Sequence, residues 1–201
     1  QFMKLSGIFK KFRREKIYKN QNVDVCLFTY LMAKPYIKKF RNAIDIGCRD
    51  GDFSRPMLND FEKIYAFDYR DRLNFSSKKL EYYQYALGDI DSKVRASGGV
   101  ITNLRNSKIN FVQQKTLDSF NFKDIDFIKI DVEGHELKVL EGAKLLIAQY
   151  SPVFVIEDNG SQVLWGKGEE NDAINYLLSL NYKIVAKNEP PLSQDYVLIR
   201  D

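Results

Sequence analysis

The sequence has few of the residues from which zinc centres and disulfide scaffolds are built. Among its 201 residues are two cysteines, Cys26 and Cys48, and one histidine, His135. A zinc site takes about three or four ligands, usually histidine or cysteine, so we expect no such metal, although carboxylates could still bind Mg²⁺ or Ca²⁺. The two cysteines are far apart and lack the C-x-x-C spacing, which argues against a disulfide framework and predicts a cytoplasmic protein.

Long apolar runs are also missing. No stretch of about 18 apolar residues occurs, which argues against a transmembrane helix. No apolar segment follows the first lysines, as it would in a secretory signal peptide. Apolar residues make up 44% of the chain and charged residues 29%, which is typical of a globular domain and not of a disordered chain.

Positive charge is concentrated at the start of the chain, within an overall net charge of +4. In the first 20 residues a single acidic residue, Glu15, accompanies many lysines and arginines. Leu5, Ile8, Phe9 and Phe12 recur at helical spacing, which predicts a basic amphipathic helix. Such a helix either packs its apolar stripe on the domain, the commoner arrangement, or makes a peripheral contact with a membrane, a nucleic acid or a protein partner.

Strand-like and helix-like segments alternate after residue 40. The runs rich in β-branched and aromatic residues, which predict seven strands, are residues 42–47, 63–69, 81–87, 125–131, 152–157, 182–186 and 196–200. The helical patterns between them are residues 53–61, 71–80, 136–150 and 172–180. This alternation predicts an α/β domain with a mostly parallel sheet and helices on its faces.

Two segments depart from the alternation. Residues 89–110 are polar and contain two adjacent glycines, which predicts an irregular or hairpin insertion beside the third strand. Residues 187–194 form a link too short for a crossover helix, which predicts a hairpin and an antiparallel last strand. We place an N-terminal helical extension at residues 1–40 and the α/β domain at residues 41–201.

A glycine loop follows the first predicted strand. It has the pattern D-x-G-x-x-x-G, with Asp45, Gly47 and Gly51, and Asp68 ends the next strand about 20 residues later, where a Rossmann-type domain binds ribose hydroxyls. Acidic residues would repel a pyrophosphate here but attract the positive sulfonium and amino groups of S-adenosylmethionine. The pattern therefore favours that cofactor, although the glycines could also serve only a tight turn, with Asp52 capping the next helix.

The fourth strand ends in a dense polar cluster that contains Asp131, Glu133 and His135. Ligands of open α/β sheets bind at the carboxyl ends of the strands, so we expect these side chains near a reaction site. A hydroxyl group that accepts a methyl must lose its proton, and each of the three could take it. The alternatives are that Glu133 only stabilises a helix N-terminus and that His135 is a surface or capping residue.

The combined pattern resembles the FkbM-type methyltransferases. The most specific part is IDFIKIDVEGHELKVLEGA, residues 125–143. Other similar blocks, in the family's order, are the glycine loop, YAFDYR at residues 65–70, YALGD at 85–89, TLDSF at 116–120 and PVFVIE at 152–157. The resemblance covers residues 42–157, which is most of the α/β domain.

This resemblance implies a Rossmann-like class I methyltransferase fold with seven strands, the last of them antiparallel. It also implies S-adenosylmethionine as the donor and a hydroxyl group of a sugar or another small molecule or glycan as the acceptor. Asp131, Glu133 and His135 are the expected catalytic residues. Those expected to bind the cofactor are Asp45, Gly47, Cys48, Gly51, Asp68, Tyr69, Ala86 and Leu87.

Three departures from the family pattern leave other functions open. Cys48 and Arg49 replace the usual Ala-Asn, Asp68 is shorter than the common glutamate, and Tyr69-Arg70 replace a proline. A degenerate fold that acts as a binding or scaffold protein is therefore the main alternative. The loop spacing argues against a nicotinamide-dependent oxidoreductase, and the missing N-P-P-[YF] tetrapeptide argues against nucleic acid as the acceptor.

Overall fold

The structure, a computed structural model, describes residues 24–97, 100–101, 110–164, 168–188 and 194–201. The predicted basic helix over residues 1–20 lies outside the described residues.

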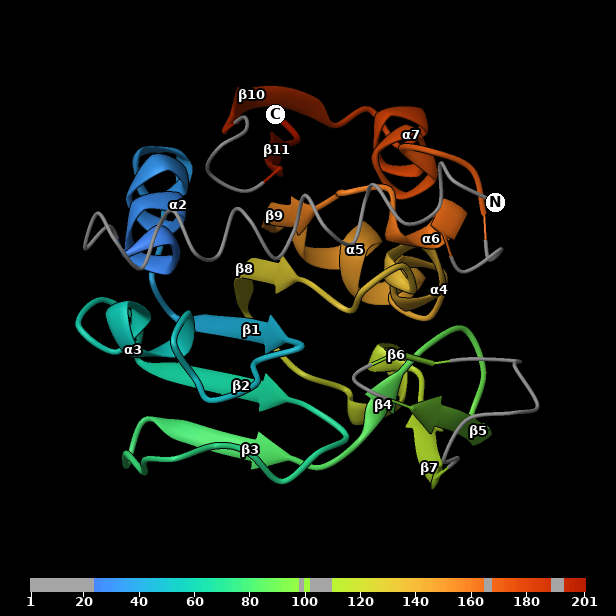
Figure 1. Ribbon diagram of the computed structural model, residues 1–201. Coiled ribbons are helices and arrows are strands. Elements are labelled where there is room, and N and C mark those ends of the chain that lie inside the picture. Colours follow the sequence, from blue (N-terminus) through green and yellow to red (C-terminus); the bar gives the residue numbers. More distant parts are fainter. Residues whose placement is uncertain (1–23, 98–99, 102–109, 165–167, 189–193) are drawn as a thin grey trace.

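Seven strands form the main sheet (Figure 1), and they are β1 (Asn42–Ile46), β2 (Lys63–Phe67), β3 (Leu80–Tyr83), β8 (Ile125–Ile130), β9 (Val153–Glu157), β10 (Lys183–Lys187) and β11 (Asp195–Ile199). Their order is β3-β2-β1-β8-β9-β11-β10. The first five of these pair in parallel, whereas β11 runs antiparallel to both β9 and β10. The predicted mostly parallel sheet with an antiparallel last strand is therefore confirmed.

Helices cover both faces of this sheet, as expected (Figure 1). They are α2 (Val25–Ala33), the 3-10 turn η1 (Lys34–Tyr36) and α3 (Ser54–Met57) on one face, and α4 (Glu136–Glu141), α5 (Lys144–Tyr150) and α7 (Asp172–Ser179) on the other, while the short α6 (Ser161–Leu164) follows β9. Successive residues of a strand point to opposite faces, so Phe127 of β8 packs with Tyr30 of α2 and Ile128 packs with Leu140 of α4. None of the helices in the described part of the chain has the length and apolar character of a membrane span.

Helix α2 is joined to the sheet by packing and by polar bonds. The Asp24 side chain accepts a hydrogen bond from the Leu27 N–H at 2.9 Å and so caps the helix. Further along, the Tyr30 hydroxyl donates to Asp60 at 2.6 Å, and the buried Thr29 hydroxyl donates to Asp195 of β11 at 2.8 Å. Residues 24–33 thus share a core with the α/β domain, and the boundary near residue 40 stays a prediction.

In the helix predicted over residues 71–80, residues 71–79 are instead irregular, and Leu80 begins β3. The side chains of Leu73 and Phe75 both lie against Gly51, where an added Cβ would be 2.7 and 2.3 Å from them. The Arg55 guanidinium lies 4.1 Å from the Phe75 ring centroid. Contacts by alternate residues on one neighbour require an extended chain, and these tertiary contacts override the local helical pattern. The preceding helix, predicted over residues 53–61, is also shorter, because α3 ends at Met57.

The long helix predicted over residues 136–150 is divided into α4 and α5 at Gly142. A Cβ at Gly142 would lie 2.0 Å from the carbonyl oxygen of Gly88. The chain around residue 88 therefore approaches the backbone at this position, and only a glycine leaves room for it.

A second, four-stranded sheet lies beyond the carboxyl ends of β1 to β3 (Figure 1), and it consists of β4 (Ala86–Leu87), β5 (Ser92–Ser97), β6 (Val100–Ile101) and β7 (Asn110–Lys115). The strand predicted over residues 81–87 is thus divided between the two sheets. Strand β5 pairs antiparallel with β6 and with β7, which confirms a hairpin insertion in the described part of residues 89–110. This sheet takes the place of a crossover helix between β3 and β8.

The turn from β8 into α4 is held by a buried carboxylate. Glu136 Oε1 accepts hydrogen bonds from the backbone N–H groups of Val132, at 3.0 Å, and Gly134, at 3.1 Å. Burial raises the pKa of Glu136 to about 7, although these N–H groups act in the opposite direction. The turn places Glu133 at φ +56° and Gly134 at φ +89°, and the left-handed conformation costs a non-glycine residue free energy. Glu136 therefore helps to hold a strained turn.

We expect Phe127→Ala to lower the free energy of unfolding by about 3–5 kcal/mol, because it empties a fully buried aromatic site. Phe127 is 0% exposed, and its ring is stacked on Phe53 with the centroids 6.2 Å apart. Chemical denaturation measures the change. Phe111→Ala is the matched control, since Phe111 is 67% exposed, and its cost should stay below about 1 kcal/mol. Similar costs at both sites would contradict the core assignment.

We also expect Glu136→Gln to flatten the pH dependence of unfolding. The pKa of Glu136 is about 7 in the folded protein, against an ordinary value of 4.5. Between these two values the folded state binds more protons than the unfolded state, so the free energy of unfolding falls as pH rises. The glutamine keeps the accepting oxygen but does not titrate, and the difference should reach at most about 3 kcal/mol across the window. Equal pH profiles of denaturation for both proteins would rule out this role.

Candidate active site

The loops that follow β1, β2 and β8 meet at one edge of the sheet. The backbone N–H groups of Gly47 and Cys48 donate to the carbonyl oxygen of Phe67, at 2.8 and 3.0 Å, and the Asp131 N–H donates to Ile46 at 3.0 Å. The predicted glycine loop, the acid after β2 and the acids after β8 are therefore brought together, as the parallel pairing of the strands requires.

The two glycines of the first loop have structural reasons to be glycine. Gly47 adopts φ +79°, and a Cβ there would lie 1.9 Å from the carbonyl oxygen of Asp131. Gly51 adopts φ +86° beneath Leu73 and Phe75. The tight-turn interpretation of these glycines thus holds, and it is compatible with a role in cofactor binding, since the same turn exposes the loop at the edge of the sheet.

A lysine lies between two carboxylates at the ends of β1 and β8. Asp45 and Lys129 are partners in the β1–β8 register, so their side chains share a face of the sheet. The Lys129 ammonium is 3.2 Å from Asp131 Oδ2 and 3.8 Å from Asp45 Oδ1. Asp45 Oδ2 accepts a hydrogen bond from the Ser54 hydroxyl at 2.6 Å, whereas Oδ1 has no hydrogen-bond partner among the described residues.

The charges of this group depend on one another. Burial raises the pKa of Asp45, and both Lys129 and the Ser54 hydroxyl offset part of that effect. Burial lowers the pKa of Lys129, but the attraction of Asp131 and Asp45 outweighs it and raises the pKa above its ordinary value. Lys129 is therefore charged, and its charge stabilises the ionised form of both aspartates.

Asp68, at the end of β2, is buried and bound by several donors. Its Oδ1 accepts from the Arg70 N–H at 2.8 Å and from Arg70 Nε at 3.1 Å, and its Oδ2 accepts from the Arg49 N–H and Arg70 Nη2, both at 3.2 Å. Burial opposes the charge of Arg70, but Asp68 raises the pKa of the guanidinium overall. The Arg70 guanidinium also lies 5.4 Å from the ring centroid of Tyr69.

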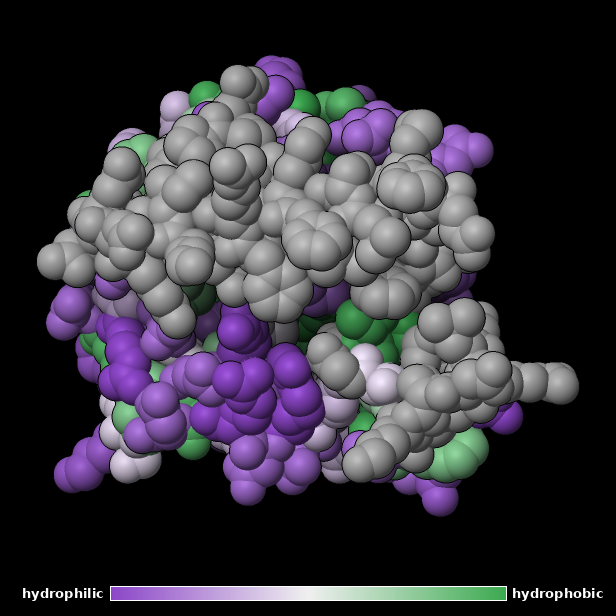
Figure 2. Space-filling model, in the orientation of Figure 1, coloured by the Kyte–Doolittle hydropathy of each residue, from purple (hydrophilic) through white to green (hydrophobic). Residues whose placement is uncertain are grey.

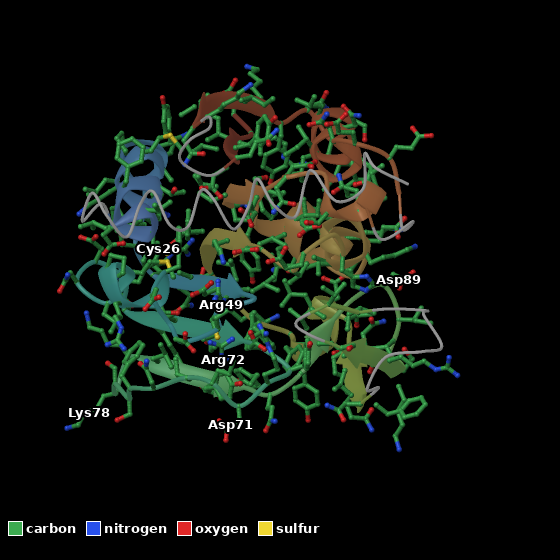
Figure 3. All side chains as sticks on the ribbon, viewed as in Figure 1. Cys26, Arg49, Asp71, Arg72, Lys78 and Asp89 are labelled. Carbon is green, nitrogen blue, oxygen red and sulfur yellow. The ribbon has the colours of Figure 1, made fainter. Side chains whose placement is uncertain are left out.

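Other charged side chains surround this part of the edge. Arg72 pairs with Asp50, with 3.0 Å between Nη2 and Oδ2. Figure 2 shows a strongly hydrophilic area in the lower half of the view, where Figure 3 labels Arg72 and Asp71. Arg49, at φ +50°, is labelled in Figure 3 near the end of β1.

Glu133 and His135 diverge from each other after β8. The carboxylate of Glu133 accepts a hydrogen bond from the Ser161 hydroxyl at 3.3 Å, which joins it to α6. His135 Nε2 lies 3.1 Å from Oε1 of Gln114, on β7 of the small sheet. Because that oxygen can only accept, Nε2 is the donor in this bond. His135 occupies the N-cap position of α4, but its side chain does not cap the helix.

The remaining predicted cofactor residues are mostly buried. The thiol of Cys48 is buried, and burial raises its pKa. Ala86 and Leu87 are also buried, and Leu87 belongs to the core cluster with α4 and α5. Their side chains are therefore part of the packing beneath the site.

The structure adds residues that the sequence analysis assigned no role. The residues that bind the predicted acids are Lys129, Arg70, Ser54 and Ser161. Lys129 carried a signal, since it is a charged residue between two isoleucines of a buried strand and such a residue needs a partner. Ser54 and Ser161 carried none, because their contacts depend on loops that approach only in the folded chain.

Comparisons with known proteins give a family and a fold. The model of the FkbM methyltransferase domain matches residues 35–184. The FkbM methyltransferase of Methylobacillus flagellatus KT has a TM-score of 0.59 at 18% identity, with 85% of this chain and 47% of that chain covered. This chain thus spans about half the length of that protein. No functionally curated protein matches the sequence.

Two further solved structures share the fold. An rRNA methylase of Streptococcus thermophilus has a TM-score of 0.51 at 11% identity, with 86% of this chain and 93% of that chain covered. The precorrin 8W decarboxylase of Methanobacterium thermoautotrophicum has a TM-score of 0.52 at 11% identity, with 89% and 90% covered. These matches confirm the predicted class I methyltransferase fold. Since the family model covers most of the sequence, the chain belongs to the FkbM family of S-adenosylmethionine-dependent methyltransferases.

Proposed function

We propose that this chain transfers a methyl group from S-adenosylmethionine to a hydroxyl group of a small molecule or glycan. The observation that carries the proposal is the set of three acids, Asp45, Asp68 and Asp131, at the carboxyl ends of three adjacent strands in a chain of this family. Ligands of this fold bind at that edge.

The charges of these residues suit a cationic ligand. The carboxylates of Asp131 and Asp45 lie 3.2 and 3.8 Å from the Lys129 ammonium at the ends of β1 and β8. One oxygen of Asp45 is buried and has no hydrogen-bond partner in the described part of the chain. Carboxylates at this edge attract a ligand with ammonium and sulfonium groups, whereas they would repel a pyrophosphate.

The residues around the three acids are proposed to bind different parts of the cofactor. The glycine loop, with Asp45, Gly47, Cys48 and Gly51, lines the methionine part of the cofactor. Asp68 accepts hydrogen bonds from the ribose hydroxyls, for which Arg70 must give up part of its contact. Tyr69, Ala86 and Leu87 lie in the segments after β2 and in β4, and they are proposed to flank the adenosine part.

The chemical step needs orientation and a proton acceptor. The bound cofactor supplies a methyl group that is already electrophilic. The site holds the acceptor oxygen in line with that methyl carbon, and such orientation is worth up to about 7–11 kcal/mol in the best intramolecular cases. The acceptor oxygen would bond to this carbon as the carbon–sulfur bond breaks and the thioether product leaves. The acceptor proton would pass to Asp131 or Glu133, the acids after β8. His135, bonded to Gln114, is the third candidate base.

The contacts of Asp68 are also compatible with the alternative function, a scaffold protein. All four donors around Asp68 come from the chain itself, two of them from the Arg70 guanidinium. In a scaffold protein that no longer binds the cofactor, these four donors would occupy the Asp68 carboxylate at all times. Cofactor binding therefore separates the enzyme from a degenerate scaffold.

The proposed location and partners are those expected from the sequence. Cys26 and Cys48 are both free, which supports action in the reducing cytoplasm. We propose that the basic segment before residue 20 makes a peripheral contact with a membrane or protein, or packs over the domain. Removal of residues 3–20 would distinguish these, since only in the first case does it abolish partner binding.

We expect Asp68→Asn to weaken the binding of S-adenosylmethionine by about 10- to 100-fold, because a charged acceptor of ribose hydrogen bonds is lost. Calorimetric titration measures the change. Asp126→Asn is the matched control, because Asp126 is also bound by an arginine side chain and backbone N–H, those of Arg41, but at the opposite end of the sheet. An equal loss in both variants would contradict the ribose role, and no binding by the unaltered protein at millimolar ligand would favour the scaffold.

We further expect Asp131→Asn or Glu133→Gln to slow methyl transfer by about 100-fold or more in whichever variant removes the base. Transfer of labelled methyl groups to a panel of hydroxyl acceptors, sugars first, measures this effect. Glu62→Gln, at an exposed glutamate before β2, serves as the control. Unchanged turnover in both variants would remove the two acids from the chemical step.

A further inference from the structure

Glu133 has a backbone conformation that its residue type rarely adopts. The left-handed region favours glycine, asparagine and aspartate. Among the described residues, the other types that adopt it are Arg49, Glu133 and Ser151. Ser151 ends α5, where this conformation is common, whereas Arg49 and Glu133 follow β1 and β8 at the edge where the site lies. Strain of this kind persists only where the surrounding structure holds it, and it is concentrated at functional sites.

Glu136 holds the backbone around Glu133. Its side chain is buried, and its Oε1 accepts hydrogen bonds from the N–H groups of Val132 and Gly134, the residues on either side of Glu133. A backbone N–H group that is buried without a partner costs free energy. The left-handed turn and the Glu136 carboxylate therefore depend on each other.

The start of α6 restricts the same turn. A Cβ on Gly134 would lie 2.8 Å from the carbonyl carbon of Ser161, so the turn touches the backbone of α6. The Ser161 hydroxyl is 3.3 Å from Glu133 Oε2 and also lies beside Asn159 Oδ1, so its one proton is shared between the two oxygens. Glu136 thus fixes the backbone of Glu133, and α6 contacts its side chain.

The position of a proton acceptor matters for the rate of the reaction. A general base must come within about 2.6–3.2 Å of the atom that carries the proton, and a displacement of about 1 Å can cost about 100-fold in rate. Glu136 is buried within the turn, so it acts on the reaction through the residues that it holds.

We propose that Glu136 is a positioning residue that holds Glu133 in place to take the proton of the acceptor hydroxyl group. This inference rests on the proposed function, and it selects Glu133 from the acids after β8 as the proton acceptor. The proton moves to the Glu133 carboxylate as the acceptor oxygen bonds to the methyl carbon and the carbon–sulfur bond breaks.

The test is methyl transfer by the full chain, with labelled S-adenosylmethionine as the donor and the methyl glycosides of glucose, galactose and mannose as the acceptors. Glu136→Ala removes both hydrogen bonds, and we expect kcat to fall by about 30-fold or more. Glu136→Gln keeps the accepting oxygen and should restore kcat to within about threefold of the unaltered protein. The affinity for S-adenosylmethionine, measured by calorimetry, should change by less than about threefold in both variants.

A double-mutant cycle with Glu133→Gln gives a readout that a merely structural residue would not change. If Glu136 acts through Glu133, then Glu136→Ala should lower kcat by less than about threefold in the Glu133→Gln background. Asp118→Ala is the matched control, because the Asp118 carboxylate also accepts from two backbone N–H groups, those of Leu145 at 2.9 Å and Leu146 at 3.0 Å. This control should lower stability and leave kcat unchanged.

The outcomes separate the two proposals. If the unaltered protein transfers no methyl group, the proposed function and this inference both fail. If it is active and Glu136→Ala lowers kcat by the same factor with and without Glu133→Gln, or not at all, only the inference is overturned. The inference is also overturned if Asp131→Asn, in place of Glu133→Gln, removes the effect of Glu136→Ala.

A second variant covers the case in which Glu136→Ala does not fold, as circular dichroism would show. Glu136→Asp then takes its place in the cycle, because its side chain is shorter by one methylene group and lengthens both bonds. We expect kcat to fall by about tenfold in this variant and by less than about threefold in the Glu133→Gln background. Equal losses in the two backgrounds would again overturn the inference.

Discussion

The contact between the ends of β1 and β8 is the constraint on which the site depends. The two strands pair in parallel through the middle of the sheet, and the Asp131 N–H continues the pairing onto Ile46. The first glycine loop must then pass directly over the carbonyl oxygen of Asp131, which only Gly47 permits. The same pairing sets Lys129 beside Asp45. Backbone geometry and buried charge are thus linked at one point.

This arrangement explains why polar residues are concentrated where the core ends. Buried charges are tolerated when they are paired, and each acid at this edge has a cationic or hydroxyl neighbour: Lys129 for Asp131, Arg70 for Asp68 and Ser54 for Asp45. The carboxylates of Asp45 and Asp131 lie beside the same ammonium, that of Lys129.

The second sheet changes how the far side of the site is built. It replaces a crossover helix and is joined to α4 through the bond of His135 to Gln114 and the close approach of Gly88 to Gly142. The division of the long predicted helix and the position of His135 have this common cause. The insertion therefore helps to place His135, one of the proposed bases.

The sequence by itself determined the mostly parallel sheet with its antiparallel last strand, the glycine loop and the acids at three strand ends, because these follow from periodicity and local spacing. The apolar runs of β1 and β8 and the short link before β11 were sufficient for that. Tertiary structure decided the extended course of residues 71–80, since Leu73 and Phe75 pack on Gly51. It also decided which side chain binds each acid, as with Ser161 and Glu133. Such contacts join residues far apart in the chain, and no local pattern encodes a distance that only the folded sheet creates.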